Sequence, residues 1–233
     1  MIIEQVTNRD CALFHPGLNA LLLIGDFNMN MDLVEIACVV DRSGSMASIC
    51  SDAIGGFNSF LANQKTQPGS TKFTLVLFDN EYQVVHNGTD IKLVEDLNTT
   101  TFMPRGSTAL LDAIGKTIDD IGTRLSQTPE SDRPGKVILA ILTDGEENAS
   151  TVYTPEKVAG MIRNQQEQYK WDVMFLAANQ DAILAAKKLA IPSENAINFS
   201  PSGAGVKMAF SALDADINHR RESHRSSKPK EVK

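Results

Sequence analysis

Four short, almost continuously apolar runs recur along the chain, and they constrain the fold more than any other feature of the sequence. Strands with this composition are typical of sheets that are buried on both faces, because an antiparallel sheet with one wet face alternates apolar and polar residues. The pattern therefore predicts a parallel sheet covered by helices on both sides. The four runs are Leu33–Val40, Phe73–Phe78, Val137–Leu142 and Val173–Ala178.

Longer stretches with helical periodicity separate these runs. The clearest places Leu110, Ile114, Ile118 and Leu125 on one face, and another opens at Thr154 with a proline next to it. Strands alternating with helices of this length predict βαβ units, and hence a doubly wound, mostly parallel α/β sheet. A weaker run, 82–85, follows the second strand so closely that we expect a hairpin and one antiparallel edge strand.

The two ends of the chain differ from the segment between them. Residues 1–30 have no clear period, which leaves two interpretations, a strand or loop packed on the domain or a dispensable extension, and we favour the second. Residues 31–218 form the predicted domain. Residues 219–233 carry six Lys/Arg against two Glu and almost no apolar side chain, so we expect a basic, disordered tail.

The charge distribution bears on the class of partner. The tail is net +4, which leaves −11 for the rest of a chain whose total is −7. An acidic body argues against a nucleic-acid-binding surface, because phosphate contacts need clustered Lys and Arg. The tail is interpreted as a solubilising segment; the alternative is an arm that contacts nucleic acid or an acidic partner.

Targeting and redox features predict a cytoplasmic protein. No apolar run is long enough to cross a bilayer, and the first residues lack the charge pattern and cleavage site of a signal peptide. The three cysteines, Cys11, Cys38 and Cys50, are an odd number without metal-binding spacing. Cys38 lies in an apolar run, where a buried free thiol is expected, and this favours a reducing compartment.

Oxygen-bearing side chains gather where three predicted elements meet. Asp41, Ser43 and Ser45 follow the first strand directly, Thr108 opens the most periodic helix, and Asp144 follows the third strand. The carboxyl ends of parallel strands meet at one edge of a sheet, so we expect these side chains to lie close together. Hydroxyls and carboxylates without thiol or imidazole suit a hard dication, Mg²⁺ or Mn²⁺.

These residues also carry a family resemblance. The segment DRSGSM at 41–46 resembles the DxSxS motif of the metal-ion-dependent adhesion site in von Willebrand factor type A (VWA) domains. Thr108 and Asp144 match the family's two other ligand positions, and the resemblance covers roughly Leu33 to Ile217. Such stand-alone members resemble bacterial and phage intracellular adaptors that work beside ring ATPases, kinases or stress-response systems.

The resemblance implies roles for the matched residues. Ser43, Ser45 and Thr108 would bind the metal directly, and Asp41 and Asp144 would bind it directly or through water while orienting the hydroxyls. A further position on the ion would stay open for a partner's Asp or Glu. The implied function is a metal-dependent, non-enzymatic protein-binding module.

The sequence leaves two alternatives open, one for the function and one for two acidic residues. The runner-up function is a metal-dependent phosphohydrolase of the haloacid dehalogenase-like type, which also places an aspartate after its first strand. That class requires a second acid where this chain has Ser43, so the acid/base partner of the nucleophile is missing. Glu146 and Glu147 are interpreted as solvated loop acids; the alternative is a role in binding a second metal.

Overall fold

A computed structural model of the chain describes residues 29–178 and 181–227. It contains a six-stranded sheet in the order β3-β2-β1-β4-β5-β6, in which only β3 is antiparallel to its neighbour. The strands are β1 (Asn30–Asp41), β2 (Ser70–Phe78), β3 (Tyr82–Asp90), β4 (Pro134–Thr143), β5 (Asp172–Ala178) and β6 (Ala196–Phe199). The predicted fold class and the antiparallel edge strand are confirmed.

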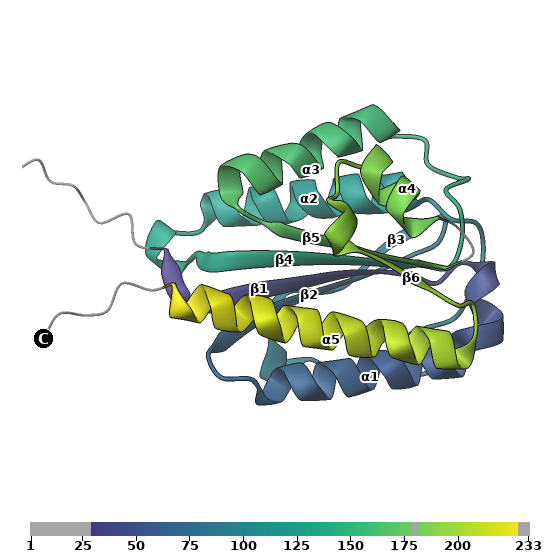
Figure 1. Cartoon of the computed structure of the whole chain (residues 1–233), viewed down its shortest axis with the longest axis horizontal. Coiled ribbons are helices and arrows are strands. Elements are labelled where there is room, and N and C mark those ends of the chain that lie inside the picture. Colours follow the sequence, from purple (N-terminus) through teal and green to yellow (C-terminus); the bar gives the residue numbers. More distant parts are fainter. Residues whose placement is uncertain (1–28, 179–180, 228–233) are drawn as a thin grey trace, which may run out of the picture.

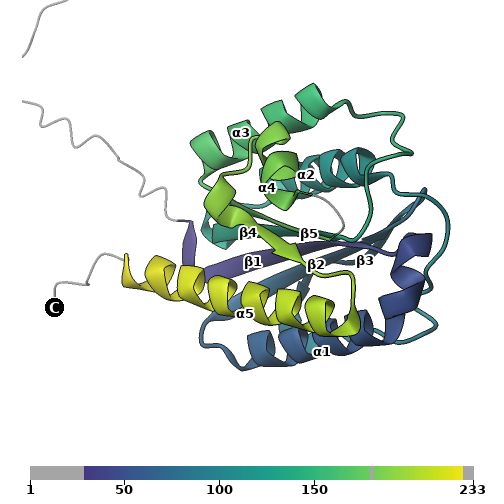
Figure 2. The ribbon, with the colours of Figure 1, turned by 45° about the vertical axis from the view of Figure 1, so that its right-hand side comes forward.

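Helices cover both faces of this sheet (Figure 1). On one face lie α1 (Cys50–Thr66) and α5 (Gly203–Ser226); on the other lie α2 (Leu110–Gln127), α3 (Pro155–Tyr169) and the short α4 (Ala182–Lys188). Figure 2, turned by 45°, shows the same two layers with α1 and α5 side by side beneath the strands. No helix in the described part of the chain is long and apolar enough to span a membrane.

The central strand β1 shows why its residues 36–40 form an unbroken apolar run. Ile36, Cys38 and Val40 pack into the core beneath α1 and α5, whereas Ala37 and Val39 pack into the core beneath α2 and α3. Successive strand residues point to opposite faces, so burial on both sides requires an unbroken apolar run. Cys38 is a buried free thiol, and burial raises its pKa far above the ordinary value.

Close packing of α5 on α1 fixes the C-terminal part of the fold. Phe57 and Phe210 meet edge to face with ring centroids 6.0 Å apart. Gly56 makes this approach possible, because a Cβ there would lie 2.7 Å from the Phe210 ring. The helix then runs back along the sheet toward the amino ends of the strands (Figure 1).

The prediction of a disordered tail from residue 219 is wrong for residues 219–226, which are the last turns of α5. Arg221 follows the buried positions Leu213 and Ile217 at four-residue spacing, so it lies on the same helical face. Arg221 as a whole is 2% exposed, and its guanidinium donates to the Gln64 Oε1 and Thr71 Oγ1 atoms at 2.7 and 2.8 Å. The composition of residues 219–233 predicted that this segment would be solvated. Arg221 is buried instead, because neutral acceptors satisfy the hydrogen bonds of its guanidinium.

Two further features of the fold differ from the sequence prediction, the start of the first strand and a sixth strand. Strand β1 begins at Asn30, which pairs with Pro134 at the start of β4, so residue 30, which was predicted to belong to the extension, lies in the sheet. Strand β6 was not predicted, because it is four residues long and only Phe199 in it is buried. Residues 1–28 lie outside the described residues, so the choice between a dispensable extension and a strand or loop packed on the domain stays a prediction. Residues 228–233 of the predicted tail also lie outside the described residues.

Candidate metal site

Asp41 is the last residue of β1, and its carboxylate is fully buried and held on both oxygens. The Ser43 backbone N–H donates to the Oδ1 atom at 2.6 Å, and the Thr143 hydroxyl donates to the Oδ2 atom at 2.6 Å. Thr143 is the last residue of the neighbouring strand β4. The parallel register of β1 and β4 therefore places both strand ends at one edge and fixes the direction of the Asp41 carboxylate.

The two predicted serines connect Asp41 to the β4 loop. The Ser43 and Ser45 hydroxyl oxygens are 3.0 Å apart, and the Ser45 hydroxyl donates to the Asp144 Oδ1 atom at 2.6 Å. Residues 99 positions apart in the chain are thus in direct contact. The first and third predicted segments of the site meet, as the sheet topology requires.

Thr108 closes the cluster from the loop before α2. A Cβ added to Gly145 would lie 3.1 Å from the Thr108 Oγ1 atom, 3.5 Å from the Ser45 Oγ atom and 3.9 Å from the Asp41 Oδ2 atom. Oxygens of the β1 end and of the Thr108 loop therefore lie around the position of a Gly145 Cβ, and Asp144, in the same loop as Gly145, is bonded to one of them, the Ser45 hydroxyl. The structure brings all five sequence-predicted residues together at the carboxyl edge of the sheet.

Backbone hydrogen bonds also join the loops that carry the candidate ligands. The Thr108 backbone N–H donates to the Asn148 Oδ1 atom at 2.9 Å, and the Asn148 N–H donates to the Thr108 carbonyl at 3.1 Å. On the other side, the Gly44 N–H donates to the Gly106 carbonyl at 3.2 Å. The Thr108 loop is therefore fixed to both carboxylate-bearing loops.

Glu147 has a structural role that the sequence interpretation missed. Its carboxylate accepts from the Leu111 N–H at 2.9 Å at the start of α2, and from the Ala149 and Ser150 N–H groups at 3.0 and 2.7 Å. An anion at a helix N-terminus satisfies orphan donors and interacts favourably with the helix dipole. The interpretation as a solvated loop acid is wrong for Glu147, because three backbone donors converge on it; Glu146 is exposed.

The electrostatics of the site favour a bound cation. Burial, together with the nearby Asp144 charge, outweighs the hydrogen bonds to the Asp41 carboxylate and raises its pKa to about 6; burial also raises the pKa of Asp144. Both carboxylates are thus disfavoured as bare anions. A dication between them would relieve this cost.

The donor set decides which cation fits. It consists of two carboxylates and three hydroxyls, and hard oxygen donors of this kind suit Mg²⁺ or Mn²⁺ better than ions that prefer sulfur or imidazole. Within the described residues, no three or more His, Cys, Asp and Glu side chains gather into a cluster that could hold a metal. Hydroxyls supply three of the five candidate donors here, so the cluster does not depend on a group of acidic residues.

The family can now be assigned. Residues 35–205 match the family model of the von Willebrand factor type A domain. The chain belongs to the VWA family. No curated protein is similar enough to match.

Solved structures with the same fold include adhesive proteins. The VWA domain is similar to proximal thread matrix protein 1 from the mussel byssus, in a structure "with zinc occupied MIDAS motif", at 17% identity and a TM-score of 0.54. That match covers 79% of this chain and 46% of the mussel protein, so this chain spans about half its length.

Two bacterial structures are also similar. The vWF domain of the pilus tip protein Mfa5 from Porphyromonas gingivalis matches at 12% identity and a TM-score of 0.57, covering 86% of this chain and 98% of that one. The pilus adhesin SpaC from Lactobacillus rhamnosus GG matches at 14% identity and 0.60, covering 83% and 30%. At these identities the likeness shows the fold alone.

Proposed function

We propose that this VWA domain is a non-enzymatic protein-binding module that captures an acidic side chain of a partner through a divalent cation. The residues that would hold the ion, Mg²⁺ or Mn²⁺, are Asp41, Ser43, Ser45, Thr108 and Asp144. The observation that carries the proposal is that these residues, from three separate segments, form one cluster: oxygens of Asp41, Ser45 and Thr108 lie within 4 Å of the position of a Gly145 Cβ, and Ser43 and Asp144 are hydrogen-bonded to Ser45.

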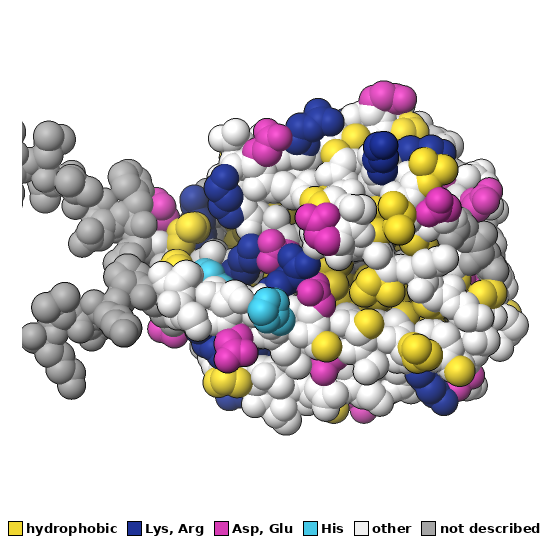
Figure 3. Space-filling model, viewed as in Figure 1, with side chains coloured by type: hydrophobic (Ala, Val, Ile, Leu, Met, Phe, Trp, Pro, Cys, Tyr) yellow, Lys and Arg dark blue, Asp and Glu magenta, His cyan; other side chains and the backbone are white. Residues whose placement is uncertain are grey.

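The charge of the donor set supports a single carboxylate as the ligand. Two carboxylates and three neutral hydroxyls leave a bound dication attractive to one further anion, which is the chemistry the ion would supply. The chain is acidic overall, at net −7, and would repel a polyanion such as nucleic acid. On the face in Figure 3, Lys and Arg are interspersed with Asp and Glu and form no continuous basic surface.

The residues of the site do not favour the phosphohydrolase alternative. The second acid of that mechanism would occupy the position of Ser43, whose hydroxyl lies against Ser45. A cytoplasmic location and a role as an adaptor remain part of the proposal. The free thiol of Cys38, buried in the core, is compatible with that location.

The test compares capture of host proteins by the wild-type chain and two variants, Asp41→Ala and Thr108→Ala, in Mg²⁺ and in EDTA. Capture by the wild type should require Mg²⁺, and both variants should lose it while remaining folded. Ser59→Ala, which removes an exposed hydroxyl on α1, is the control that should bind normally. Replacing the partner's Asp or Glu with Asn or Gln should abolish capture as well.

A partner that binds equally well to Asp41→Ala in EDTA would refute the metal-bridge mechanism. Phosphate release from phosphorylated compounds by the Mg²⁺-loaded protein would instead support the phosphohydrolase.

A further inference from the structure

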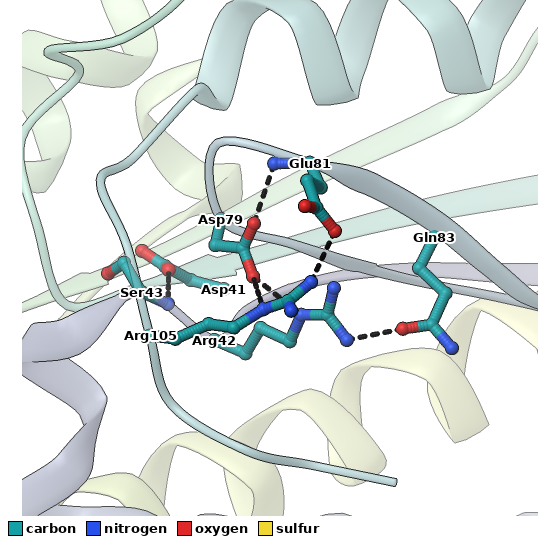
Figure 4. Close-up of polar contacts among 7 residues, drawn as sticks. All are labelled: Asp41, Arg42, Ser43, Asp79, Glu81, Gln83 and Arg105. Carbon is teal, nitrogen blue, oxygen red and sulfur yellow. Dashed lines mark hydrogen bonds and ion pairs between the residues drawn. The ribbon is translucent and has the colours of Figure 1, made fainter.

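Asp79 is a buried carboxylate that immediately follows β2 and takes no part in the metal site described above. Its side chain is fully buried, and its Oδ2 atom accepts from the Arg42 Nε and the Arg105 Nε atoms, each at 3.0 Å. Its Oδ1 atom accepts from the Glu81 backbone N–H at 2.6 Å. Figure 4 shows the two guanidinium groups meeting at this one carboxylate.

The two arginines come from the two loops that carry most of the candidate ligands. Arg42 lies between Asp41 and Ser43, and Arg105 is three residues before Thr108. Each guanidinium has a second partner: Arg105 pairs with Glu81, and Arg42 donates to the Gln83 side chain. Asp79 therefore links the loop after β1 to the loop before α2.

Backbone hydrogen bonds run alongside this link. The Ala109 N–H donates to the Asp79 carbonyl at 2.9 Å, and the Arg105 N–H donates to the Arg42 carbonyl at 2.9 Å. Between them, Gly106 has a φ of +65°, and a Cβ there would lie 1.9 Å from the Asn80 Oδ1 atom. The Thr108 loop thus passes tightly against the β2–β3 turn, in a conformation that favours glycine.

We infer that Asp79 and Arg105 are positioning residues for the metal site: the Asp79 carboxylate, through Arg42 and Arg105, holds the Thr108 hydroxyl in place opposite Ser43 and Ser45. This inference rests on the proposed function. A purely electrostatic role is the competing explanation. Two guanidinium groups beside a cation site would repel the ion, so their charge alone would weaken its binding. Their presence there is better explained by a structural role, in which they hold the Thr108 loop in position.

Arg105→Gln separates the two explanations by the sign of its effect. Arg105 is 48% exposed on its side chain, so the substitution should leave the domain folded. If Arg105 acts only through its charge, removing that charge should strengthen Mn²⁺ binding. If it positions the Thr108 loop, binding should weaken by about 10-fold or more, the range typical of residues that orient metal ligands.

Arg105→Lys sharpens the comparison. Lysine keeps the charge but cannot reproduce the planar guanidinium that bonds Asp79 and Glu81 together. A charge effect predicts wild-type affinity for this variant, whereas positioning predicts a loss similar to that of Arg105→Gln. Hydrogen exchange of the Ala109 amide without metal gives a second readout, and it should become faster in both variants.

The matched control is Glu35→Gln, which neutralises another buried carboxylate paired with an arginine, Arg124. Glu35 is six residues before Asp41 on β1, about 20 Å away along the strand, so its loss should lower stability without changing metal affinity.

The experiment measures Mn²⁺ binding to the full chain by electron paramagnetic resonance, with melting temperatures recorded alongside. Wild-type affinity in both Arg105 variants, or tighter binding in Arg105→Gln, would overturn the inference and leave the proposed function standing. Absence of Mn²⁺ binding by the wild type would overturn the proposed function and this inference together.

Discussion

The end of α5 offers a quantitative test of how the fold is held together. Ending the chain at Asn218 removes residues 219–233, whereas ending it at Ser227 removes only residues 228–233. The first truncation deletes Arg221, whose guanidinium donates to the Gln64 side chain at 2.7 Å, to Thr71 at 2.8 Å and to the Pro68 carbonyl at 3.2 Å. The second truncation leaves all these contacts in place.

The size of the effect follows from these contacts. Hydrogen bonds from a charged donor are worth about 1.5–3 kcal/mol each. Burying the guanidinium offsets part of this, and burial beside Arg225 lowers the pKa of Arg221 to about 10. We take the net loss as about 3 kcal/mol, which in a domain of this size corresponds to a melting temperature lower by about 6–12 °C.

The assay is thermal unfolding followed by circular dichroism, for the full chain and both truncations. The chain ending at Ser227 should melt like the full chain, and the chain ending at Asn218 should melt at the lower temperature. Arg221→Met in the full chain isolates the guanidinium, because methionine keeps most of the apolar stem, and it should reproduce much of the loss. If the two truncations melted within about 1 °C of each other, the assigned role of Arg221 would be wrong.

Three further predictions concern the metal site. Gly145→Ala should weaken Mg²⁺ binding with little loss of stability, because its Cβ would enter the space 3.1 Å from the Thr108 Oγ1 atom; calorimetric titration measures this. The raised pKa of Asp41, from 3.8 to about 6, means that the folded state binds more protons than the unfolded state in that range. Stability of the metal-free protein should therefore fall as pH rises from about 4 to 6, and Asp41→Asn should remove this dependence in urea unfolding at each pH. Glu147→Ala should destabilise the domain by about 1–2 kcal/mol, since it removes the acceptor of one backbone donor at the start of α2 and two in the loop after β4, and Glu146→Ala is the control that should not.

Most of the sheet could be predicted from the sequence because its strands are buried on both faces. Every residue of a strand such as Val137–Leu142 is buried on one face or the other, so the whole run is apolar. Such a run can be recognised in the sequence without knowing which elements pack against it. Strand β6 and the end of α5 were not predictable in this way. Phe199 alone is buried in β6, and Arg221 becomes a core residue only because Gln64 and Thr71, far away in the sequence, supply acceptors.

The same distinction applies to the site. The five candidate ligands follow strand ends or open a helix within recognisable short segments, so topology alone predicts that they meet. The residues that hold them were missed, because their roles depend on pairings across loops. Asn148 bonds Thr108, Thr143 bonds Asp41, and Asp79 bonds two arginines, and none of these pairs has a local sequence pattern. The one signal in the sequence was the position of Asp79, an aspartate directly after the predicted strand Phe73–Phe78.

The hydrogen bonds around the site suggest how metal binding relates to folding. The Ser45 hydroxyl donates to Asp144, whereas the backbone N–H of Thr108 donates to the Asn148 side chain. An ion would replace the Ser45–Asp144 bond, but the bond between Thr108 and Asn148 involves no candidate ligand oxygen and would remain. The bonds that hold the loops together are therefore distinct from the bond that an ion would replace. It also follows that substitutions at the ligands should affect binding far more than folding, whereas substitutions at Asn148 or Glu147 should affect both.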